Sequence, residues 1–207
     1  MKTPSLVVFA SGGGSNLQAI IDAIAVAELQ MRIVLVISDQ PNSGAVQRAL
    51  TNSIPVCAIP YPRQATAEQR IAWESTAINV IDSFTPDLVL LSGFMRILSS
   101  ATLSRVTVPI LNQHPALLPD DGGDIVTLHD GRTIPALRGA HVVRDALTQN
   151  LPVTGCTIHR VVPEVDRGPV LARAKVDIVP GDDEASLYAR IRAVEQPLLI
   201  ATLQKFE

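Results

Sequence analysis

The chain has 207 residues, of which 47% are apolar and 18% are charged, so it can bury a sizeable core and is not expected to be disordered. Its 17 basic and 20 acidic residues leave a net charge of −3, and only 3% are aromatic, which argues against nucleic acid or a membrane as partner. No apolar run approaches the roughly 20 residues of a membrane-spanning helix. Cys57 and Cys156 stand singly in apolar runs, which predicts buried thiols in a cytoplasmic protein.

Apolar strands alternate with helical patterns over the first half of the chain. The predicted strands, each a continuous apolar run, cover residues 5–10, 32–38, 54–60, 87–93 and 109–113. The predicted helices cover residues 15–30, where apolar residues fall at helical spacing, and residues 44–51 and 67–84, the last ended by Pro86. Strands without polar alternation are buried on both faces. The pattern therefore predicts an α/β fold, a Rossmann-like open sheet that is mostly parallel, with helices on both faces.

The second half of the chain follows a different pattern. Residues 119–135 show little periodicity and predict a loop or a small hairpin around Asp130 and Gly131. The elements expected after it are a short helix, an antiparallel strand pair and a final helix, over residues 141–149, 154–162 with 169–178, and 182–203. No repeat or low-complexity linker interrupts the sequence, so a single domain over residues 1–207 is predicted.

A glycine-rich turn, SGGGSN at residues 11–16, separates the first strand from the first helix. Ligands of open α/β sheets bind at the carboxyl ends of the strands, and backbone N–H groups at a helix start attract anions. The turn predicts a phosphate site, with a simple tight turn as the alternative. A dinucleotide site fits less well, because Leu17 replaces the third glycine of the fingerprint, although Asp39 stands where a ribose-binding acid would.

Asn112 and His114 follow a buried strand, where both side chains can face the same ligand. An amide N–H and an imidazole can stabilise the oxyanion that forms when an acyl carbon is attacked. Asp166 lies in the turn between the two late strands, and we expect it beside His114, where a carboxylate favours imidazolium and can move a proton. A structural histidine and a turn-capping aspartate are the alternatives. The sequence has no GxSxG, HExxH or paired cysteines, so a serine hydrolase and a metal site are disfavoured.

Six motifs, together and in this order, resemble the phosphoribosylglycinamide formyltransferase family: SGGGSNLQAII, PDLVLLSGFMRIL, LNQHPALLP, GAHVVRDAL, TGCTIHRV and VDRGPV. The resemblance runs from Val7 to Leu203. It implies the formyltransferase fold and transfer of a formyl group from the co-substrate 10-formyltetrahydrofolate to the amine of glycinamide ribonucleotide, in purine synthesis and without a metal. It also implies a phosphate- and nucleotide-binding half, residues 1–110, and a catalytic and folate-binding half, residues 111–207.

The resemblance also assigns roles to residues. The catalytic residues would be Asn112, His114 and Asp166, with His114 and Asn112 stabilising the oxyanion and Asp166 keeping His114 oriented and charged. The ribonucleotide would contact the glycine loop and the final helix through Gly14, Ser15, Asn16, Arg192, Ala193, Val194 and Glu195. The folate would contact Arg70, Met95, Arg96, Ile97, Leu98, Asn112, Val162, Pro163, Glu164, Val165 and Asp166. Taken without the family, most of these read as surface charges or core residues.

Besides ending at Glu207, earlier than family members with a further C-terminal hairpin, the sequence departs from the family pattern in two places. Residues 120–137 look like an insertion directly after LLP, and they suggest a lid over the substrates or an oligomer contact. For that reason no site is transferred to the segment between Pro119 and Gly139. Gln113 stands where an apolar residue is common. The chain is expected to act as a monomer or a homodimer.

Other activities remain open at this stage. A formyltransferase acting on charged tRNA and a formyltetrahydrofolate hydrolase share the Asn-His-Asp arrangement. The first normally carries a C-terminal domain and a basic surface, the second an N-terminal regulatory domain, and we expect neither here. A non-catalytic nucleotide- or folate-binding module and an NAD-dependent dehydrogenase are the alternatives from other classes.

Overall fold

The computed structural model describes residues 2–207, and the chain divides into two compact units. Unit 1 runs to Leu111 and includes Gln204–Glu207, and unit 2 is Asn112–Leu203. Unit 1 contains β1 Ser5–Phe9, α1 Ser15–Ala25, β2 Arg32–Ser38, α2 Gly44–Thr51, β3 Val56–Ala58, α3 Ala67–Phe84, β4 Leu88–Leu91, α4 Ser100–Arg105 and the start of β5 Ile110–His114. Unit 2 contains the end of β5, β6 Ile125–Thr127, β7 Thr133–Pro135, α5 Val142–Thr148, β8 Val153–Arg160, β9 Val170–Asp177 and α6 Glu184–Leu203. The 3-10 turn Gln204–Phe206 follows.

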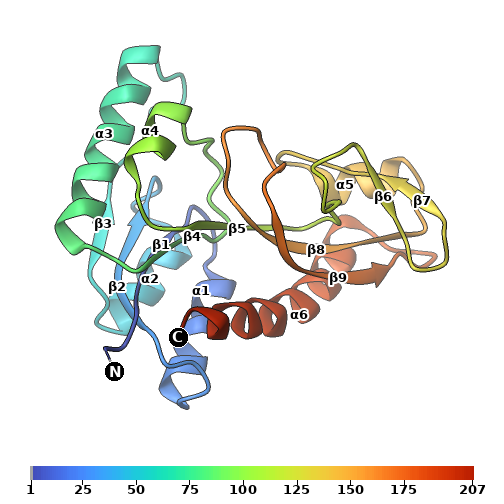
Figure 1. The fold of residues 1–207 in the computed structure, drawn as a ribbon, viewed down its shortest axis with the longest axis horizontal. Helices are drawn as coiled ribbons and strands as arrows, with labels where there is room; N and C mark the ends of the chain where they lie inside the picture. The colour runs from blue at the N-terminus through green and yellow to red at the C-terminus, as the bar shows by residue number, and fades with distance from the viewer. Residues whose placement is uncertain (1) are drawn as a thin grey trace. The chain divides into compact units, whose positions relative to one another are not determined.

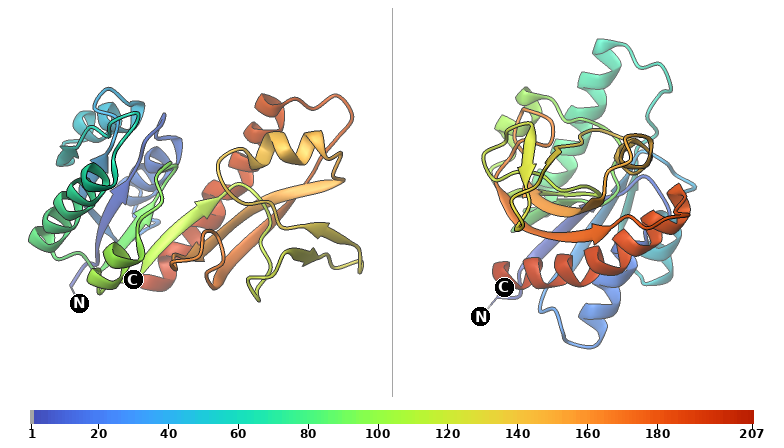
Figure 2. Two further views of the ribbon diagram at one scale, coloured as in Figure 1. Left: turned by 90° about the horizontal axis from the view of Figure 1, so that it is seen from above. Right: turned by 90° about the vertical axis from the view of Figure 1, so that its right-hand side faces the viewer.

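The strands form a seven-stranded sheet in the order β3-β2-β1-β4-β5-β8-β9. In unit 1 the central strand β1 is buried over its whole length and pairs in parallel with β2 and β4. Of its helices, α1 packs on α2 and α3 packs on α4. Figures 1 and 2 show these two pairs on opposite faces of the unit 1 strands. The prediction of a mostly parallel sheet with an antiparallel C-terminal pair is confirmed.

Two features of unit 1 differ from the sequence-based expectation by more than two residues. The first helix ends at Ala25 instead of residue 30, because Ala27 takes a left-handed backbone (φ 58°) and the N–H groups of Glu28 and Leu29 fold back onto the carbonyl of Ala23. This reversal buries Leu29 in the core, at 1% exposure. The short helix α4 was not expected.

The start of α4 is fixed by a long-range contact. Ser99 caps the helix by accepting a hydrogen bond from the N–H of Thr102. The buried carboxylate of Glu74, on α3, accepts hydrogen bonds from the hydroxyls of both residues. Serine and threonine at these positions signal a cap, but their acceptor lies 25 to 28 residues earlier in the sequence.

In unit 2, β8 and β9 form an antiparallel pair from Val153↔Asp177 to His159↔Val170, with a register shift between Ile158 and His159. Helices α5 and α6 share a core with one face of this pair, including Cys156 on β8. Pro197 lies inside α6 without ending it. Side chains three apart in a strand point to opposite faces. Accordingly, Val153 packs on the other face, against Leu117.

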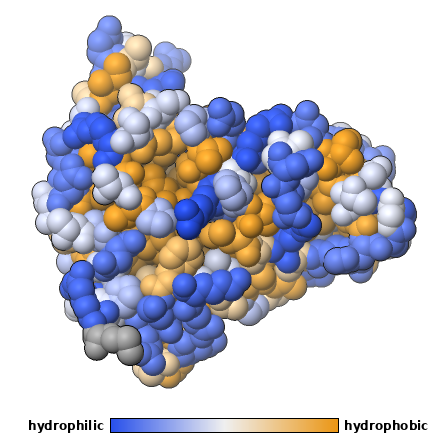
Figure 3. All heavy atoms as spheres, viewed as in Figure 1, coloured by the Kyte–Doolittle hydropathy of each residue, from blue (hydrophilic) through white to orange (hydrophobic). Residues whose placement is uncertain are grey.

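The segment predicted as a loop or hairpin is a hairpin, with Val126 opposite Ile134. Both side chains are buried, at 2% and 5% exposure, against Leu117 and Val153. Figure 3 shows hydrophilic side chains interspersed with apolar ones at the right-hand end of the face, where Figure 1 places the hairpin. The hairpin is therefore packed, through Val126 and Ile134, against the rest of unit 2. Within residues 2–207, no helix has both the length and the apolar character needed to cross a membrane.

Candidate active site

The structure brings Asn112, His114 and Asp166 together in unit 2. Asn112 and His114 lie at the end of β5, two residues apart, so that both point to the same side of the strand. Asp166 comes from the loop between β8 and β9. Its Oδ2 lies 3.4 Å from Nδ1 of His114, and its Oδ1 accepts a hydrogen bond of 3.4 Å from Nδ2 of Asn112.

His159, near the end of β8, is a fourth member of this cluster that the sequence analysis missed. Its Nε2 lies 3.2 Å from Nδ2 of Asn112 and 3.5 Å from Oδ1 of Asp166. Its Nδ1 lies 2.9 Å from the carbonyl of Arg160, which can only accept, so Nδ1 carries a proton. In the neutral ring Nε2 then accepts from Asn112. The available signal was a polar ring in a strand whose other central residues are all buried.

Both ring nitrogens of His114 face acceptors. Nε2 donates to the carbonyl of Leu137 at 2.7 Å, and Nδ1 faces the Asp166 carboxylate. Burial nevertheless lowers the pKa of His114, and the attraction to Asp166 and the bond to Leu137 offset that effect only in part. His159 and Arg138 lower it further. Burial therefore pushes the resting ring toward the neutral form, and the attraction to Asp166 acts in the opposite direction, toward the charged form.

Asp166 is held in an uncommon backbone conformation, with φ 53° in the left-handed region. Its Oδ2 accepts from the N–H of Gly139 at 3.1 Å, and its carbonyl accepts from Nε of Arg138 at 3.1 Å. Burial alone would raise the pKa of Asp166, but the interactions with His159, His114 and Gly139 outweigh it and lower the pKa to about 2. The carboxylate is thus ionised across the physiological range.

The glycine turn of unit 1 is shaped by its contact with α2. The carbonyls of Gly12 and Gly13 accept from the N–H of Ala45 (3.1 Å) and from Nε of Arg48 (3.0 Å). Because N–H and C=O point in opposite directions across a trans peptide, the following N–H groups point away from α2. Gly14, with φ 73°, precedes α1, and a Cβ there would lie 2.6 Å from the Cα of Ala45. Only glycine fits this position.

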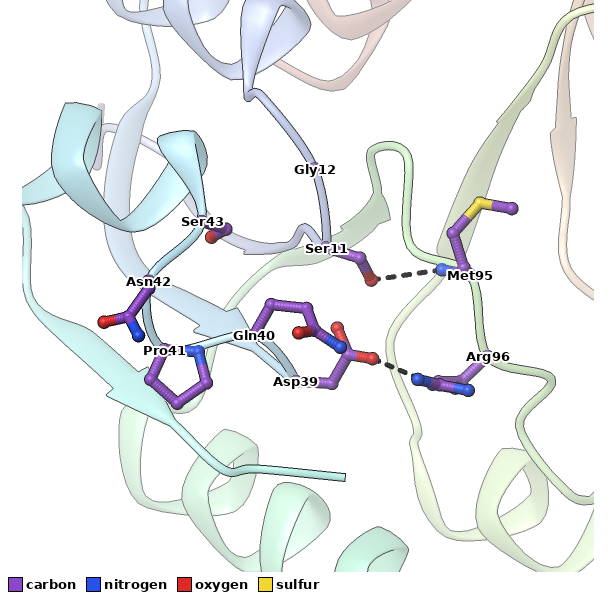
Figure 4. A pocket seen from close by; sticks show the side chains of 9 residues that line it. All are labelled: Ser11, Gly12, Asp39, Gln40, Pro41, Asn42, Ser43, Met95 and Arg96. Carbon is purple, nitrogen blue, oxygen red and sulfur yellow. Dashed lines mark hydrogen bonds and ion pairs between the residues drawn. The ribbon is translucent and has the colours of Figure 1, made fainter. Parts of the chain in front are cut away.

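A cavity of about 510 Å³ in unit 1 adjoins this turn (Figure 4). Its lining residues come from the ends of β1, β2 and β4: Ser11, Gly12, Asp39, Gln40, Pro41, Asn42, Ser43, Met95 and Arg96. The hydroxyl of Ser11 accepts from the N–H of Met95 at 3.2 Å. The structure therefore brings two of the predicted folate residues, Met95 and Arg96, next to the start of the glycine turn.

Arg96 is fixed from two sides. Its Nε donates to Oδ2 of Asp39 at 2.8 Å, and its guanidinium carbon lies 4.4 Å from the ring centre of Tyr61. Asp39 is only 1% exposed and its Oδ1 has no hydrogen-bond partner in the structure, whereas Arg96 is 32% exposed. Tyr61 in turn packs edge-on against Trp73. Arg96 is thus oriented by a buried carboxylate and an aromatic ring.

The remaining predicted site residues lie on surfaces of different kinds. In unit 1, Arg70 is exposed on α3 and does not line the cavity, Ile97 is 67% exposed and Leu98 is buried. In unit 2, residues 162–165 form a largely exposed loop that presents Val165, at 40% exposure.

The predicted ribonucleotide contacts divide between the two units, with residues 14–16 at the start of α1 and residues 192–195 on α6. Arg192 stacks on Tyr188, with its guanidinium carbon 5.1 Å from the ring centre, and Val194 packs on the core. Glu195 is buried, at 2% exposure. Each set stays a prediction.

Two buried polar side chains, Cys156 and Gln113, take no part in the cluster. Burial, with Glu195 nearby, raises the pKa of Cys156 to about 12, so this thiol stays protonated and unreactive, as its apolar context predicts. Gln113, between the two catalytic candidates, is 7% exposed and its amide nitrogen and oxygen lack hydrogen-bond partners. Among residues 2–207 no group of three His, Cys, Asp or Glu side chains is arranged to hold a metal ion.

Known proteins resemble this chain over nearly its whole length. A family model described as formyl transferase matches residues 5–203. The phosphoribosylglycinamide formyltransferase of Mycobacterium tuberculosis (strain CDC 1551 / Oshkosh) is 39% identical over 198 residues, which are 96% of this chain and 82% of that protein. The trifunctional purine biosynthetic protein adenosine-3 of Homo sapiens is 32% identical over 203 residues, 98% of this chain and 18% of that protein. The crystal structure of phosphoribosylglycinamide formyltransferase from Bacillus halodurans matches with a TM-score of 0.83 at 33% identity, covering 97% of this chain and 94% of that one.

Proposed function

The chain belongs to the formyl transferase family, and on that premise we propose that it transfers the formyl group of 10-formyltetrahydrofolate to the amine of glycinamide ribonucleotide in purine synthesis. The observation that carries the proposal is the buried cluster in which Asn112 and His114 each lie 3.4 Å from the carboxylate of Asp166. The names of its relatives supply the formyl acceptor, since phosphoribosylglycinamide formyltransferases match nearly all of the chain, and the family implies the formylfolate donor.

The reaction begins when the neutral amine of the ribonucleotide attacks the formyl carbon and the carbonyl oxygen becomes an oxyanion. Nδ2 of Asn112 has two hydrogens, one directed at His159 and one in a long contact with Asp166. The long contact is the weaker of the two and can be exchanged for the oxyanion. Because the cluster is buried, a donor aimed at developing charge is worth more there than in water.

His114 is the second group at the oxyanion, and its charge changes during the reaction. A negative oxyanion beside the ring favours imidazolium, which opposes the effect of burial. In the imidazolium, Nδ1 of His114 carries a proton that faces Asp166. The carboxylate of Asp166 stabilises this proton and stays ionised, because its pKa is about 2. If the ring acts through Nε2, the carbonyl of Leu137 must first release it. The proton lost by the amine then passes to the departing folate nitrogen through these groups or through water.

The binding assignments follow the chemistry of each surface. The N–H groups of Gly13 and Gly14 point away from α2 and suit the phosphate of the ribonucleotide, with Ser15 and Asn16 beside them and Arg192 to Glu195 for the rest of this substrate. Met95 and Ile97 in unit 1, and Val165 in unit 2, each expose an apolar side chain of the kind that packs on a flat aromatic ring. Arg96 and Arg70 offer cations to the carboxylates of the folate. All these roles belong to the proposal.

The test is an assay with 10-formyltetrahydrofolate and glycinamide ribonucleotide that follows the deformylated folate. The same protein is offered the formyl donor alone, and the donor with charged initiator tRNA. Turnover that requires the ribonucleotide supports the proposal. Equal release without any acceptor identifies a hydrolase, and release only with tRNA identifies the other transferase. No turnover by folded protein with any acceptor contradicts formyl transfer altogether.

A further inference from the structure

The insertion contacts the loop that carries Asp166. Asp124, in the insertion, accepts from Nη1 of Arg138 at 3.1 Å and from Nη2 of Arg167 at 2.6 Å. Both arginines also donate to the carbonyl of Gly122. We call Asp124, Arg138 and Arg167 the Asp124 clamp. A Cβ on Gly122, whose φ is 67°, would lie 2.9 Å from the carbonyl oxygen of Arg167, so the two backbones touch.

The clamp reaches Asp166 through one side chain. The terminal nitrogens of Arg138 donate hydrogen bonds to Asp124 and to the carbonyl of Gly122 in the insertion. Its Nε donates to the carbonyl of Asp166 at 3.1 Å. The next residue, Gly139, donates its N–H to the Asp166 carboxylate at 3.1 Å. Arg138 is only 15% exposed, whereas Asp124 is 74% exposed. The backbone and the carboxylate of Asp166 are thus both held by Arg138 and Gly139, the two residues directly after the insertion.

The hydrogen bonds from Arg138 and Gly139 stabilise an uncommon backbone conformation of Asp166. A left-handed φ of 53° is sparsely populated by residues other than glycine and persists where its surroundings enforce it. The bond between the N–H of Arg167 and the carbonyl of Glu164, at 3.3 Å, closes the turn but does not contact the carbonyl of Asp166. In the structure that carbonyl is fixed by Arg138.

We propose that Asp124 and Arg138 are positioning residues: through them the insertion sets the backbone of Asp166 and hence the distance of its carboxylate from His114 and Asn112. Neither residue contacts the reacting atoms. An exposed ion pair contributes little to global stability, so the fold should be kept when the pair of Asp124 and Arg138 is lost. Because the hold on Asp166 is lost as well, the loop of residues 162–168 should loosen and the chemical step should slow.

The first test needs no substrate and uses hydrogen–deuterium exchange of the full-length protein. Asp124→Ala is compared with Asp130→Ala, which removes another exposed carboxylate of the same hairpin, paired only with its neighbour Arg132. We expect peptides covering residues 162–168 to exchange about tenfold faster in Asp124→Ala and as in the parent in Asp130→Ala. Unchanged exchange in Asp124→Ala overturns the proposal.

The second test separates positioning from charge by comparing Arg138→Lys with Arg138→Met. Lysine keeps a cation but cannot bond Asp124 and the Asp166 carbonyl at once with a planar fork. Both variants should lower kcat about tenfold with little change in either KM, because a small displacement of a catalytic group slows chemistry. Full activity in both contradicts positioning.

The pH profile supplies a readout that a purely structural role would not move. The groups facing His114 are Asp166, His159, the Leu137 carbonyl and Arg138, and Arg138 lowers the pKa of His114. Arg138→Met should therefore shift the His114 limb of the profile upward, while Arg138→Lys should not. The kinetic tests rest on the proposed function, whereas hydrogen exchange does not. If the parent protein shows no turnover but residues 162–168 exchange faster in Asp124→Ala, the proposed activity is refuted. The positioning of Asp166 by the Asp124 clamp is then still supported.

Discussion

The cluster in unit 2 and the cavity in unit 1 hold their polar side chains in different ways. In the cluster, His114 and Asp166 have side-chain exposures of 3% and 9% and face each other at 3.4 Å. In the cavity, Arg96 is 32% exposed and is oriented from behind by Asp39, which is 1% exposed. The first arrangement suits groups whose charge must change during a reaction, and the second suits a fixed charge that meets a ligand.

The two regions also differ in how the chain builds them. The cavity residues follow strands of a parallel sheet, whose carboxyl ends meet at one edge whatever the loops do. The cluster joins a strand end, the loop before α5 and the loop between β8 and β9, so it depends on loop conformations. Substitutions in the cluster should therefore change kcat, and those around the cavity should change substrate affinity.

The largest effect is expected for His114→Ala. Loss of a positioned acid–base and oxyanion group should lower kcat about 10²- to 10⁴-fold, because the other ring of the cluster, His159, faces Asn112 and the Oδ1 side of Asp166 and does not occupy the place of His114. The measurement is steady-state kinetics with both substrates, with circular dichroism to check folding. His129→Ala, at an exposed position on the hairpin, is the matched control and should keep parental rates. A His114→Ala variant with the kcat of the parent would contradict the assignment of His114 as a catalytic residue.

The next effect concerns stability and pH. The folded pKa of Asp166, about 2, lies below the roughly 3.9 of an unfolded aspartate, so its ionised form stabilises the protein above that unfolded value. This contribution, on the order of 2 kcal/mol, is lost as the pH falls from about 4 through about 2. Urea unfolding of the parent and of Asp166→Asn across this range should show their difference shrinking toward acid. A constant difference would mean that the carboxylate is not held as described.

A smaller effect is expected at the cavity. Asp39→Asn removes the charge that orients Arg96 and should raise KM for the formylfolate about tenfold, close to 1.4 kcal/mol, with kcat changed less than about twofold. Asp22→Asn is the control, since Asp22 only accepts from Gln18 on the exposed face of α1. If kcat falls and KM stays unchanged, Asp39 and Arg96 act in the chemical step. The assignment of catalysis to the cluster and of binding to the cavity would then be wrong.

The smallest effect is a gain in stability. Gln113→Leu replaces a buried amide without partners by an apolar side chain of similar size, and should raise the free energy of unfolding by about 1 kcal/mol. Denaturant unfolding gives the value, with Gln149→Leu, exposed after α5, expected to stay within about 0.5 kcal/mol. Destabilisation by Gln113→Leu would show that the amide is satisfied in solution.

Prediction from the sequence succeeded where the physics is local. The apolar runs of β1, β2 and β4, the glycine turn before α1 and the hairpin around Asp130 follow from strand burial, helix-start geometry and turn chemistry. It failed at the end of α1, where the left-handed Ala27 lets Leu29 reach the core, and at α4, whose start is bonded by Glu74. Both failures involve a partner that local periodicity does not contain.

For the site, the sequence by itself determined which chemical groups were available and, through ordered motifs, the family to which they belong. Only the tertiary structure decided that Asp166 meets Asn112 and His114, that His159 joins them and that Arg138 holds Asp166 from 28 residues away. It also decided that Leu137 occupies Nε2 of His114 and that burial lowers the pKa of the ring. The reason is physical: residue types and short-range periodicity are written along the chain, whereas burial and contacts between distant loops exist only once the chain has folded.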